Sequence, residues 1–282
     1  MRRSLDSDFF SLAPPRIFAH RGASGEFPEN TMASFEAAAR LGAEYFELDV
    51  HMTRDGEVVI SHDSDLSRVS GREGAIAELT LAQVQDADAG YAFSLDGGAT
   101  YPFRDRGIKI PALAELLGAF PKGRFNIEPK QTAPSVIPAL LKVIDRAGAR
   151  RRVLVAGEQQ PPIDELRALA PGVPTSFPYG EVAEFLQAMA AKQTGYAPRA
   201  DALQIPPEYQ GWKLATPEIL AFARGLGVEV HVWTVNDPVE MNTLLDAGVA
   251  GIFTDFPARG LAVAHSRTSA MVAAAQARAP RR

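Results

Sequence analysis

The chain has 282 residues, of which 46% are hydrophobic, and a formal net charge of −5. This length allows one large domain or two small ones. The mildly acidic charge argues against nucleic acid as the main partner, because phosphate backbones select clustered positive charge. The sequence contains no cysteine, which excludes disulfides, thiolate metal sites and cysteine nucleophiles.

The two ends of the chain differ in composition from the residues between them. Residues 1–15 contain two arginines before Pro14-Pro15 but no apolar run of signal-peptide length. We interpret them as a disordered or loosely docked N-terminal arm. Residues 266–282 are rich in alanine and arginine, which indicates a flexible C-terminal tail, with an extended terminal helix as the alternative. No stretch approaches the roughly 20 apolar residues of a membrane span, so we expect a cytoplasmic protein without stable membrane insertion.

Residues 16–265 contain no linker and alternate between two patterns, which predicts one domain. Caps, breakers and hydrophobic periodicity agree on the boundaries of these patterns. The expected strands are 17–20, 45–50, 124–128, 153–156, 174–177, 202–205, 229–235 and 251–254. The expected helices are 32–41, 135–147, 163–170, 181–191, 217–225 and 239–247. Eight strands with crossover helices favour a (β/α)8 TIM barrel. A doubly wound open sheet is the alternative, without the glycine-rich signature that would support it.

Residues 64–110 interrupt the alternation and predict a small insertion after the second strand, because they are too long for a plain βα loop. A short helix is expected at 79–86, and an extra strand at 58–61 leads into the insertion. The turn-rich part contains four aromatic residues, which either line a ligand pocket or form a separate small core. These aromatic residues are Tyr91, Phe93, Tyr101 and Phe103.

Two carboxylates share one face of the expected strand 45–50. In the run YFELDV, alternation places Glu47 and Asp49 on one side of the strand and the apolar residues on the other. Carboxylates that point into a barrel repel each other and lose hydration unless a cation joins them. An exposed edge strand with solvated acids is the alternative, but the flanking residues are too apolar for an edge.

A third carboxylate lies at the end of the expected strand 124–128. Glu128 is placed where TIM barrels build their active sites, and Lys130 follows on the same face. An ordinary surface ion pair between Glu128 and Lys130 is the alternative. Three carboxylates suit Mg²⁺ or Ca²⁺ better than zinc, and the lysine suits a phosphate oxygen.

Two histidines lie at expected strand ends. His20 is followed directly by Arg21 and Gly22, and His62 is followed by Asp63. Neutral histidines perform acid and base chemistry near neutral pH, and an arginine fork binds tetrahedral anions. Together with the carboxylates, these residues predict a metal-assisted site that cleaves a phosphate ester.

Several other residues have less distinctive surroundings. Trp233, in the run HVWTVN, either packs on a substrate's carbon skeleton or belongs to the core. His231 has the same parity but lies deeper, so it is left out of the site. We expect a supporting role for His51, a loop-shaping role for Asp255 and no role for His265.

These motifs resemble the glycerophosphodiester phosphodiesterase family. The resemblance covers roughly residues 17 to 260, and the ordered set of HRG, ELDV and HD is highly specific. The matching blocks are FAHRGASGEFPENTMASFEAA, YFELDVHMTRDGEVVISHD, IPALAELL, FNIEPK, VHVWTVND and GIFTDFP. Two positions depart from the family pattern: Ala250 replaces a common aspartate, and Pro129 stands where a branched aliphatic residue is common. Neither position is a predicted ligand.

The resemblance implies a TIM barrel with an insertion after strand two, and it implies a role for each matching residue. A divalent cation, Mg²⁺ or Ca²⁺, would be held by Glu47, Asp49 and Glu128. The general acid and base would be His20 and His62. The substrate would be contacted by Arg21, Lys130 and Trp233.

The implied reaction splits a small-molecule glycerophosphodiester into an alcohol and sn-glycerol 3-phosphate. Its first nucleophile is either water or the glycerol 2-hydroxyl, and we favour the hydroxyl. Two other functions stay open. Lysophospholipase D or sphingomyelinase D activity would need a wide apolar groove. A non-catalytic phosphodiester-binding barrel would tolerate loss of a charged site residue, whereas all seven polar positions are present.

Overall fold

The protein is described by a computed structural model that covers residues 7–278, with side chains described through residue 269. Its centre is a barrel of parallel strands. The strands are β1 (Arg16–His20), β2 (Tyr45–Met52), β4 (Arg124–Pro129), β5 (Val153–Val155), β6 (Ala202–Ile205), β9 (Glu229–Val232) and β10 (Gly251–Thr254). They neighbour one another in the order β5-β4-β2-β1-β10-β9-β6. Parallel bridges Val155–Thr175 and Ser176–Ala202 join the two ends of this order. The closed barrel confirms the predicted (β/α)8 fold.

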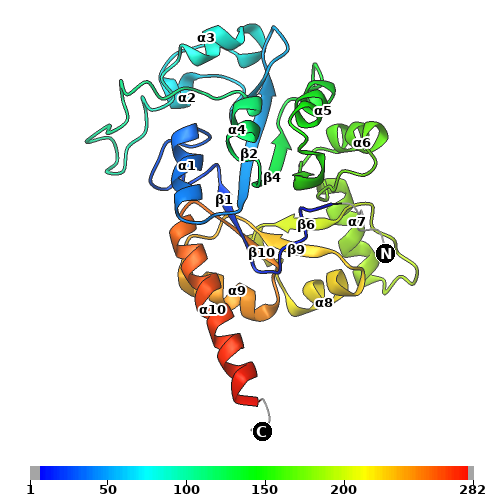
Figure 1. Cartoon of the computed structure of the whole chain (residues 1–282). Helices are drawn as coiled ribbons and strands as arrows, with labels where there is room; N and C mark the ends of the chain where they lie inside the picture. Colours follow the sequence, from blue (N-terminus) through cyan, green and yellow to red (C-terminus); the bar gives the residue numbers. More distant parts are fainter. Residues whose placement is uncertain (1–6, 279–282) are drawn as a thin grey trace.

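Helices surround this barrel (Figure 1). They are α1 (Met32–Arg40), α4 (Leu113–Ala119), α5 (Ile137–Arg146), α6 (Gln160–Leu169), α7 (Tyr179–Ala190), α8 (Pro217–Gly225), α9 (Pro238–Ala247) and α10 (Pro257–Arg278). The side chains of Thr31, Thr216 and Asp237 cap three of them by accepting backbone N–H groups. The last helix continues to Arg278, so the expected C-terminal tail is helical to that residue; residues 279–282 lie outside the description.

Two expected strands are shorter than the sequence suggested. Within the expected strand 174–177, only Thr175 and Ser176 form β-bridges. The Pro174 carbonyl still accepts the Val155 N–H, and the Phe177 N–H still bonds to the Ala202 carbonyl. The regular part of β9 ends at Val232. Beyond it, the backbone N–H of Trp233 still bonds to the Ile205 carbonyl, at 3.1 Å.

The amino end of the barrel is filled by aromatic rings. Phe9, from the N-terminal arm, is fully buried and packs against Phe18 and Tyr45. The N–H groups of Asp8 and Phe9 both bond to the Arg151 carbonyl. The expectation of a disordered or loose arm is therefore wrong for residues 7–15, because an aromatic anchor holds them in place.

The insertion forms a small unit of its own, at the upper left of Figure 1. It contains α2 (Ser67–Ser70), a 3-10 turn η1 (Ile76–Glu78) and α3 (Leu81–Gln85), and it follows β3 (Val58–Ile60), which pairs antiparallel with β2. Its core contains Leu66, Ile76 and Val84. Phe93 packs edge-on against Phe103, with ring centroids 5.4 Å apart.

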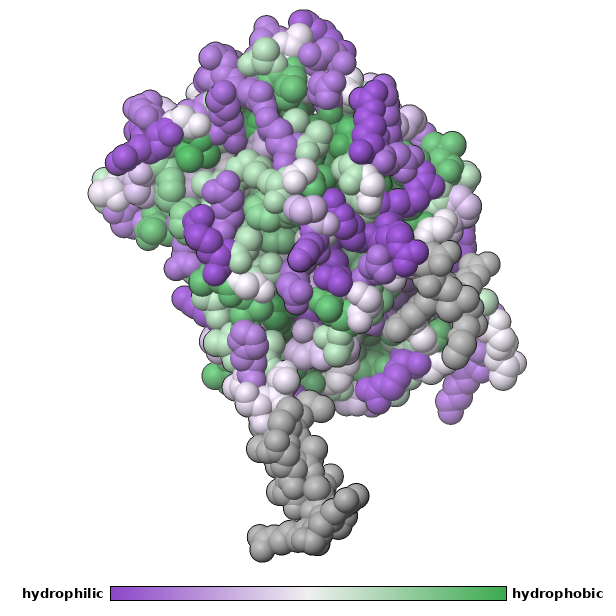
Figure 2. All heavy atoms as spheres, in the orientation of Figure 1, coloured by the Kyte–Doolittle hydropathy of each residue, from purple (hydrophilic) through white to green (hydrophobic). Residues whose placement is uncertain are grey.

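The remaining elements are small. They are the 3-10 turn η2 (Arg150–Arg152) and the strands β7 (Glu208–Tyr209) and β8 (Trp212–Lys213), which form a hairpin. No helix within residues 7–278 is long and apolar enough to cross a membrane. On the face shown in Figure 2, polar and apolar side chains are interspersed.

Candidate active site

The floor of the site is built by strand register. Neighbouring strands place His20 beside Glu47, and Glu47 beside Asn126. Two residues further along β2, Asp49 lies beside Glu128. Alternation turns these side chains toward the barrel axis, while Phe46 and Leu48 pack outward in the main core. One carboxylate oxygen from each of Glu47, Asp49 and Glu128 falls within 4.8 Å of the others.

The three carboxylates carry an electrostatic cost. Burial and the charge of Asp49 raise the pKa of Glu47 to about 8, despite His20 and Arg21 nearby. Burial also raises the pKa of Glu128 above its usual value, although Lys130 opposes this shift. Like charges in a dry site disfavour ionisation. A bound cation would remove this cost.

Two cationic side chains border the carboxylates. Lys130 Nζ lies 2.8 Å from Glu128 and 3.4 Å from Asp49. Burial lowers the pKa of Lys130, but the two carboxylates outweigh it and raise that pKa to about 12. Arg21 Nη1 donates to Glu29 at 3.0 Å, and Arg21 Nε lies 3.3 Å from Asp49 without making a hydrogen bond within the described residues.

The loop that carries Arg21 has an unusual backbone. Arg21 and Asn30 both have positive φ, at 54° and 56°, which is uncommon for residues with a side chain. The Arg21 carbonyl accepts the Asn30 N–H and the Ser34 hydroxyl, each at 3.0 Å. At Gly22, a Cβ would lie 2.3 Å from Ser34 Oγ, so only glycine fits. Such conformations persist where the surroundings enforce them, often at functional sites.

His20 is oriented by an aspartate. Its Nδ1 lies 2.6 Å from Asp255 Oδ1, and its Nε2 faces Glu47 at 3.8 Å. Burial raises the pKa of Asp255, but hydrogen bonds from His20 and Asn236 outweigh it and hold that pKa at about 2. Burial lowers the pKa of His20, but Glu47 and Asp255 reverse this and raise it above the usual value. An ionised Asp255 therefore makes Nδ1 the donor and leaves Nε2 facing the cavity.

His62 belongs to a second histidine–aspartate pair. Its Nδ1 lies 2.7 Å from Asp63 Oδ1. The His62 carbonyl accepts a hydrogen bond from His51 Nε2 at 3.2 Å. His51 is buried, so it supports the segment that carries His62, in line with the supporting role expected for it.

One cavity of about 520 Å³ contains all eight side chains singled out in the sequence. They are His20, Arg21, Glu47, Asp49, His62, Glu128, Lys130 and Trp233. The opposite wall is apolar and comes largely from α7 and the segments around it. That wall includes Phe177, Val182, Leu186, Ile205 and Leu214. The insertion aromatics do not line the cavity; Tyr91 and Tyr101 instead pack against Arg104. Of the two interpretations of these aromatics, the structure favours the separate packing unit.

Several residues around the site were not predicted from the sequence. Asp255 was expected only to shape a loop, yet it contacts His20. A signal was available, because β1 and β10 are neighbours in a closed barrel and residues that follow them meet. Glu29 and Asn236 lie inside the matching blocks FAHRGASGEFPENTMASFEAA and VHVWTVND, but no role was assigned to either residue. His231 lies deep at the other end of the barrel, fully buried 3.2 Å from Glu229, as expected from its position.

Known proteins resemble this chain in sequence and in fold. The model of the "Glycerophosphoryl diester phosphodiesterase family" matches residues 20–259. A glycerophosphodiester phosphodiesterase of Bacillus subtilis is 32% identical, over 87% of this chain and 86% of the relative. "Probable glycerophosphodiester phosphodiesterase 2" of Mycobacterium tuberculosis is 37% identical, over 84% and 86%. A phosphodiesterase structure from Oleispira antarctica, in complex with the product sn-glycerol-3-phosphate, shares the fold with a TM-score of 0.72 at 24% identity, over 88% of this chain and 96% of that one.

Proposed function

The chain belongs to the glycerophosphoryl diester phosphodiesterase family, a family of phosphodiester hydrolases, and we propose that it hydrolyses glycerophosphodiesters to an alcohol and sn-glycerol 3-phosphate with the help of a divalent cation. One observation carries this proposal. Three buried carboxylates gather on the floor of a cavity that also holds two histidines, an arginine and a lysine. We place the reaction in the cytoplasm, with water-soluble diesters as substrates.

The donor set fits a hard cation. Glu47, Asp49 and Glu128 offer only oxygen atoms, the ligands that Mg²⁺ and Ca²⁺ prefer. Oxygens within 4.8 Å of one another match two ligands on either side of such an ion, whose bonds are about 2.0–2.6 Å long. When bound, the cation supplies Lewis-acid stabilisation of negative charge on the phosphate.

Arg21 and Lys130 are proposed to hold the phosphate of the substrate. Both lie beside the carboxylates, where a diester bound near the cation reaches them. Arg21 lines the cavity, and its Nε–H is held 3.3 Å from Asp49 without a hydrogen bond within the described residues, so this guanidinium keeps donor capacity beside the carboxylates. Preorganised donors of this kind stabilise charge that develops in the transition state.

His20 and His62 are proposed to move the protons. One histidine deprotonates the nucleophile, and the other protonates the leaving alkoxide. Each has its Nδ1 held by an aspartate, at 2.6 and 2.7 Å, so both present Nε2 to the reaction. We propose the glycerol 2-hydroxyl as the first nucleophile, which gives a cyclic phosphate that is then hydrolysed. A substrate without the 2-hydroxyl should react much more slowly, and cleavage at an unchanged rate would contradict this route.

The proposal is tested by glycerol 3-phosphate release from glycerophosphocholine. The protein is treated with a chelator, and Mg²⁺ or Ca²⁺ is added back separately. We expect release to stop on chelation and to return with one of the cations. Metal binding without release by either cation would support a non-catalytic phosphodiester-binding barrel instead.

The apolar wall of the cavity favours a second candidate, lysophospholipase D activity. Glycerophosphocholine has no apolar chain to place against Leu186 and Leu214, whereas the acyl chain of a lysophospholipid does. Rates on glycerophosphocholine and lysophosphatidylcholine separate the two candidates. A Leu186→Asp variant sharpens the comparison, because a charge on this apolar wall should lower the rate on the lysophospholipid selectively.

A further inference from the structure

Arg68, from α2 of the insertion, reaches back to the active-site loops. Its Nη1 and Nη2 donate to the two carboxylate oxygens of Glu29 at 2.9 and 2.7 Å. Its Nε donates to Asp63 Oδ2 at 2.5 Å. One guanidinium therefore holds two carboxylates from separate loops, a geometry that a lysine ammonium cannot reproduce.

Each of these carboxylates has a second partner inside the site. Glu29 Oε1 also accepts a hydrogen bond from Arg21 Nη1 at 3.0 Å. Asp63 Oδ1 lies 2.7 Å from His62 Nδ1. Arg68 is thus one contact away from the arginine assigned to the phosphate and one contact away from a histidine assigned to proton transfer.

The contacts form a continuous chain in which acidic and basic side chains alternate. It runs from Asp49 to Arg21, Glu29, Arg68, Asp63 and His62. Arg68 is the member that lies furthest out, with its side chain 48% exposed, and it does not line the cavity. Without it, the Glu29 and Asp63 carboxylates would lose the cation between them, and each would be free to turn away from its catalytic neighbour.

We propose that Arg68 is a positioning residue, by which the insertion fixes Arg21 and His62 relative to each other. This inference rests on the proposed function, because it assigns Arg68 a part in that reaction. It also gives the insertion a role in the reaction that its aromatic residues do not have. Residues that hold the hydrogen-bond partners of catalytic groups affect the reaction without touching the substrate.

The test compares Arg68→Ala with Arg72→Ala in the full-length protein. Arg72 belongs to the same insertion and forms an exposed ion pair with Asp86 at 3.0 Å, which does not reach the site. With glycerophosphocholine and the activating cation, we expect Arg68→Ala to lower kcat/KM by about 10–100-fold, the usual effect of losing such a support. Arg72→Ala should match the parent protein, and both variants should keep its thermal unfolding midpoint, because exposed ion pairs add little to stability.

Two further measurements separate positioning from general structural damage. Added guanidinium should restore part of the activity of Arg68→Ala and leave Arg72→Ala unchanged. Arg68→Lys should stay well below the parent protein, because the two-carboxylate geometry is lost. The inference is overturned by parent-like kcat/KM in Arg68→Ala, by full activity in Arg68→Lys, or by a loss that guanidinium does not reverse. A parent protein that is inactive with every cation would instead count against the proposed function.

Discussion

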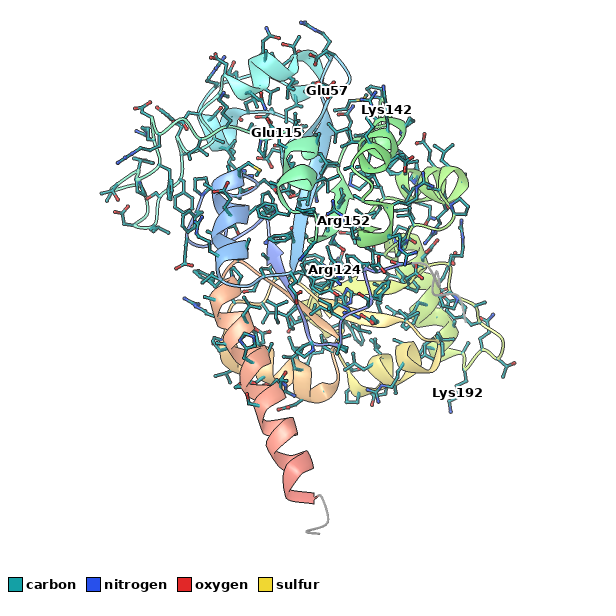
Figure 3. The ribbon with its side chains drawn as sticks, in the orientation of Figure 1. Glu57, Glu115, Arg124, Lys142, Arg152 and Lys192 are labelled. Carbon is teal, nitrogen blue, oxygen red and sulfur yellow. The ribbon has the colours of Figure 1, made fainter. Side chains whose placement is uncertain are left out.

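Buried charges are fully paired at one end of the barrel and incompletely paired at the other. At the amino end, Arg16 is only 2% exposed, yet its guanidinium is fully engaged: Nε and Nη2 bond to the two oxygens of Glu229 at 2.8 and 3.0 Å, and Nη1 bonds to the Tyr45 hydroxyl at 2.8 Å. Arg124 begins β4 and Arg152 directly precedes β5, so both lie at the amino end of the barrel; Figure 3 labels them. Both bind backbone carbonyls there, those of Asp8 and of the α4 end.

At the carboxyl end, the charges are less well matched. Three carboxylates meet within 4.8 Å, and the Arg21 Nε and Asn30 Oδ1 atoms, both buried, have no hydrogen-bond partner among the described residues. Buried charges are tolerated when partners inside the chain satisfy them. The difference therefore indicates which end is built for stability and which end is completed by ligands. Changes at the first end should lower stability, and changes at the second should lower activity.

The largest effect is expected at the carboxyl end. His20→Ala should reduce kcat by about 10²–10⁴-fold, the usual contribution of a general acid or base. The thermal unfolding midpoint should change little, because His20 is a cavity residue. His265→Ala is a matched control, since His265 is exposed on α10 and lies outside the cavity. Near-normal turnover by His20→Ala would remove this histidine from the reaction.

At the amino end, the expected loss is one of stability. Arg16→Ala leaves the Glu229 carboxylate buried without its main partner, which typically costs about 3–5 kcal/mol. Urea unfolding measures this loss, and kcat per folded molecule should be unchanged. Arg150→Ala is the control, because the exposed Arg150–Asp145 pair should contribute at most about 1 kcal/mol. Equal losses in the two variants would show that the buried pair has no special role.

The same ion pair predicts a pH dependence. Burial raises the pKa of Glu229, but hydrogen bonds from His231 and Arg16 outweigh it and lower that pKa from 4.5 to about 2. Its stabilising effect is therefore present above about pH 4.5 and is lost as the pH falls toward 2. Glu229→Gln should be less stable than the parent protein at pH 7, and this gap should narrow in urea unfolding at pH 4 and pH 3. If the difference in unfolding free energy between the parent protein and Glu229→Gln stays constant with pH, the carboxylate charge is not the stabilising feature.

Sequence patterns predicted some features of this molecule, and there are physical reasons why they did not predict others. The YFELDV run indicated the carboxylate pair because period-two alternation assigns strand faces locally. The barrel followed from strands and helices in alternation. The Glu29–Arg68–Asp63 contacts could not be predicted, because they depend on how a long insertion folds back over the barrel. The docking of Phe9 was missed because one aromatic residue in a polar arm gives no periodic signal. Local patterns thus predicted the strand-borne floor of the site, and not the contacts between loops.

The smallest expected effect is a gain of stability at the carboxyl end. It distinguishes the two ends of the barrel most clearly, because most substitutions of buried residues lower stability. Without a cation, Glu47→Gln removes a buried carboxyl group that must either repel its neighbours or take up a proton. The substitution should therefore raise the free energy of unfolding by about 0.5–2 kcal/mol, as substitutions at strained active sites often do. Its activity should be lost. Asp145→Asn, at an exposed surface pair, is the control and should not be stabilised.

Adding the activating cation should reverse this order of stability. A cation that binds only the folded parent protein stabilises it by about 2.7 kcal/mol at about 100 times its Kd, whereas Glu47→Gln, with a weakened ligand set, should gain much less. Thermal unfolding with and without the cation measures both shifts. If Glu47→Gln is destabilised without the cation, the Glu47 carboxylate is satisfied within the chain. The carboxyl end would then resemble the amino end, and the case for a cation at this site would weaken.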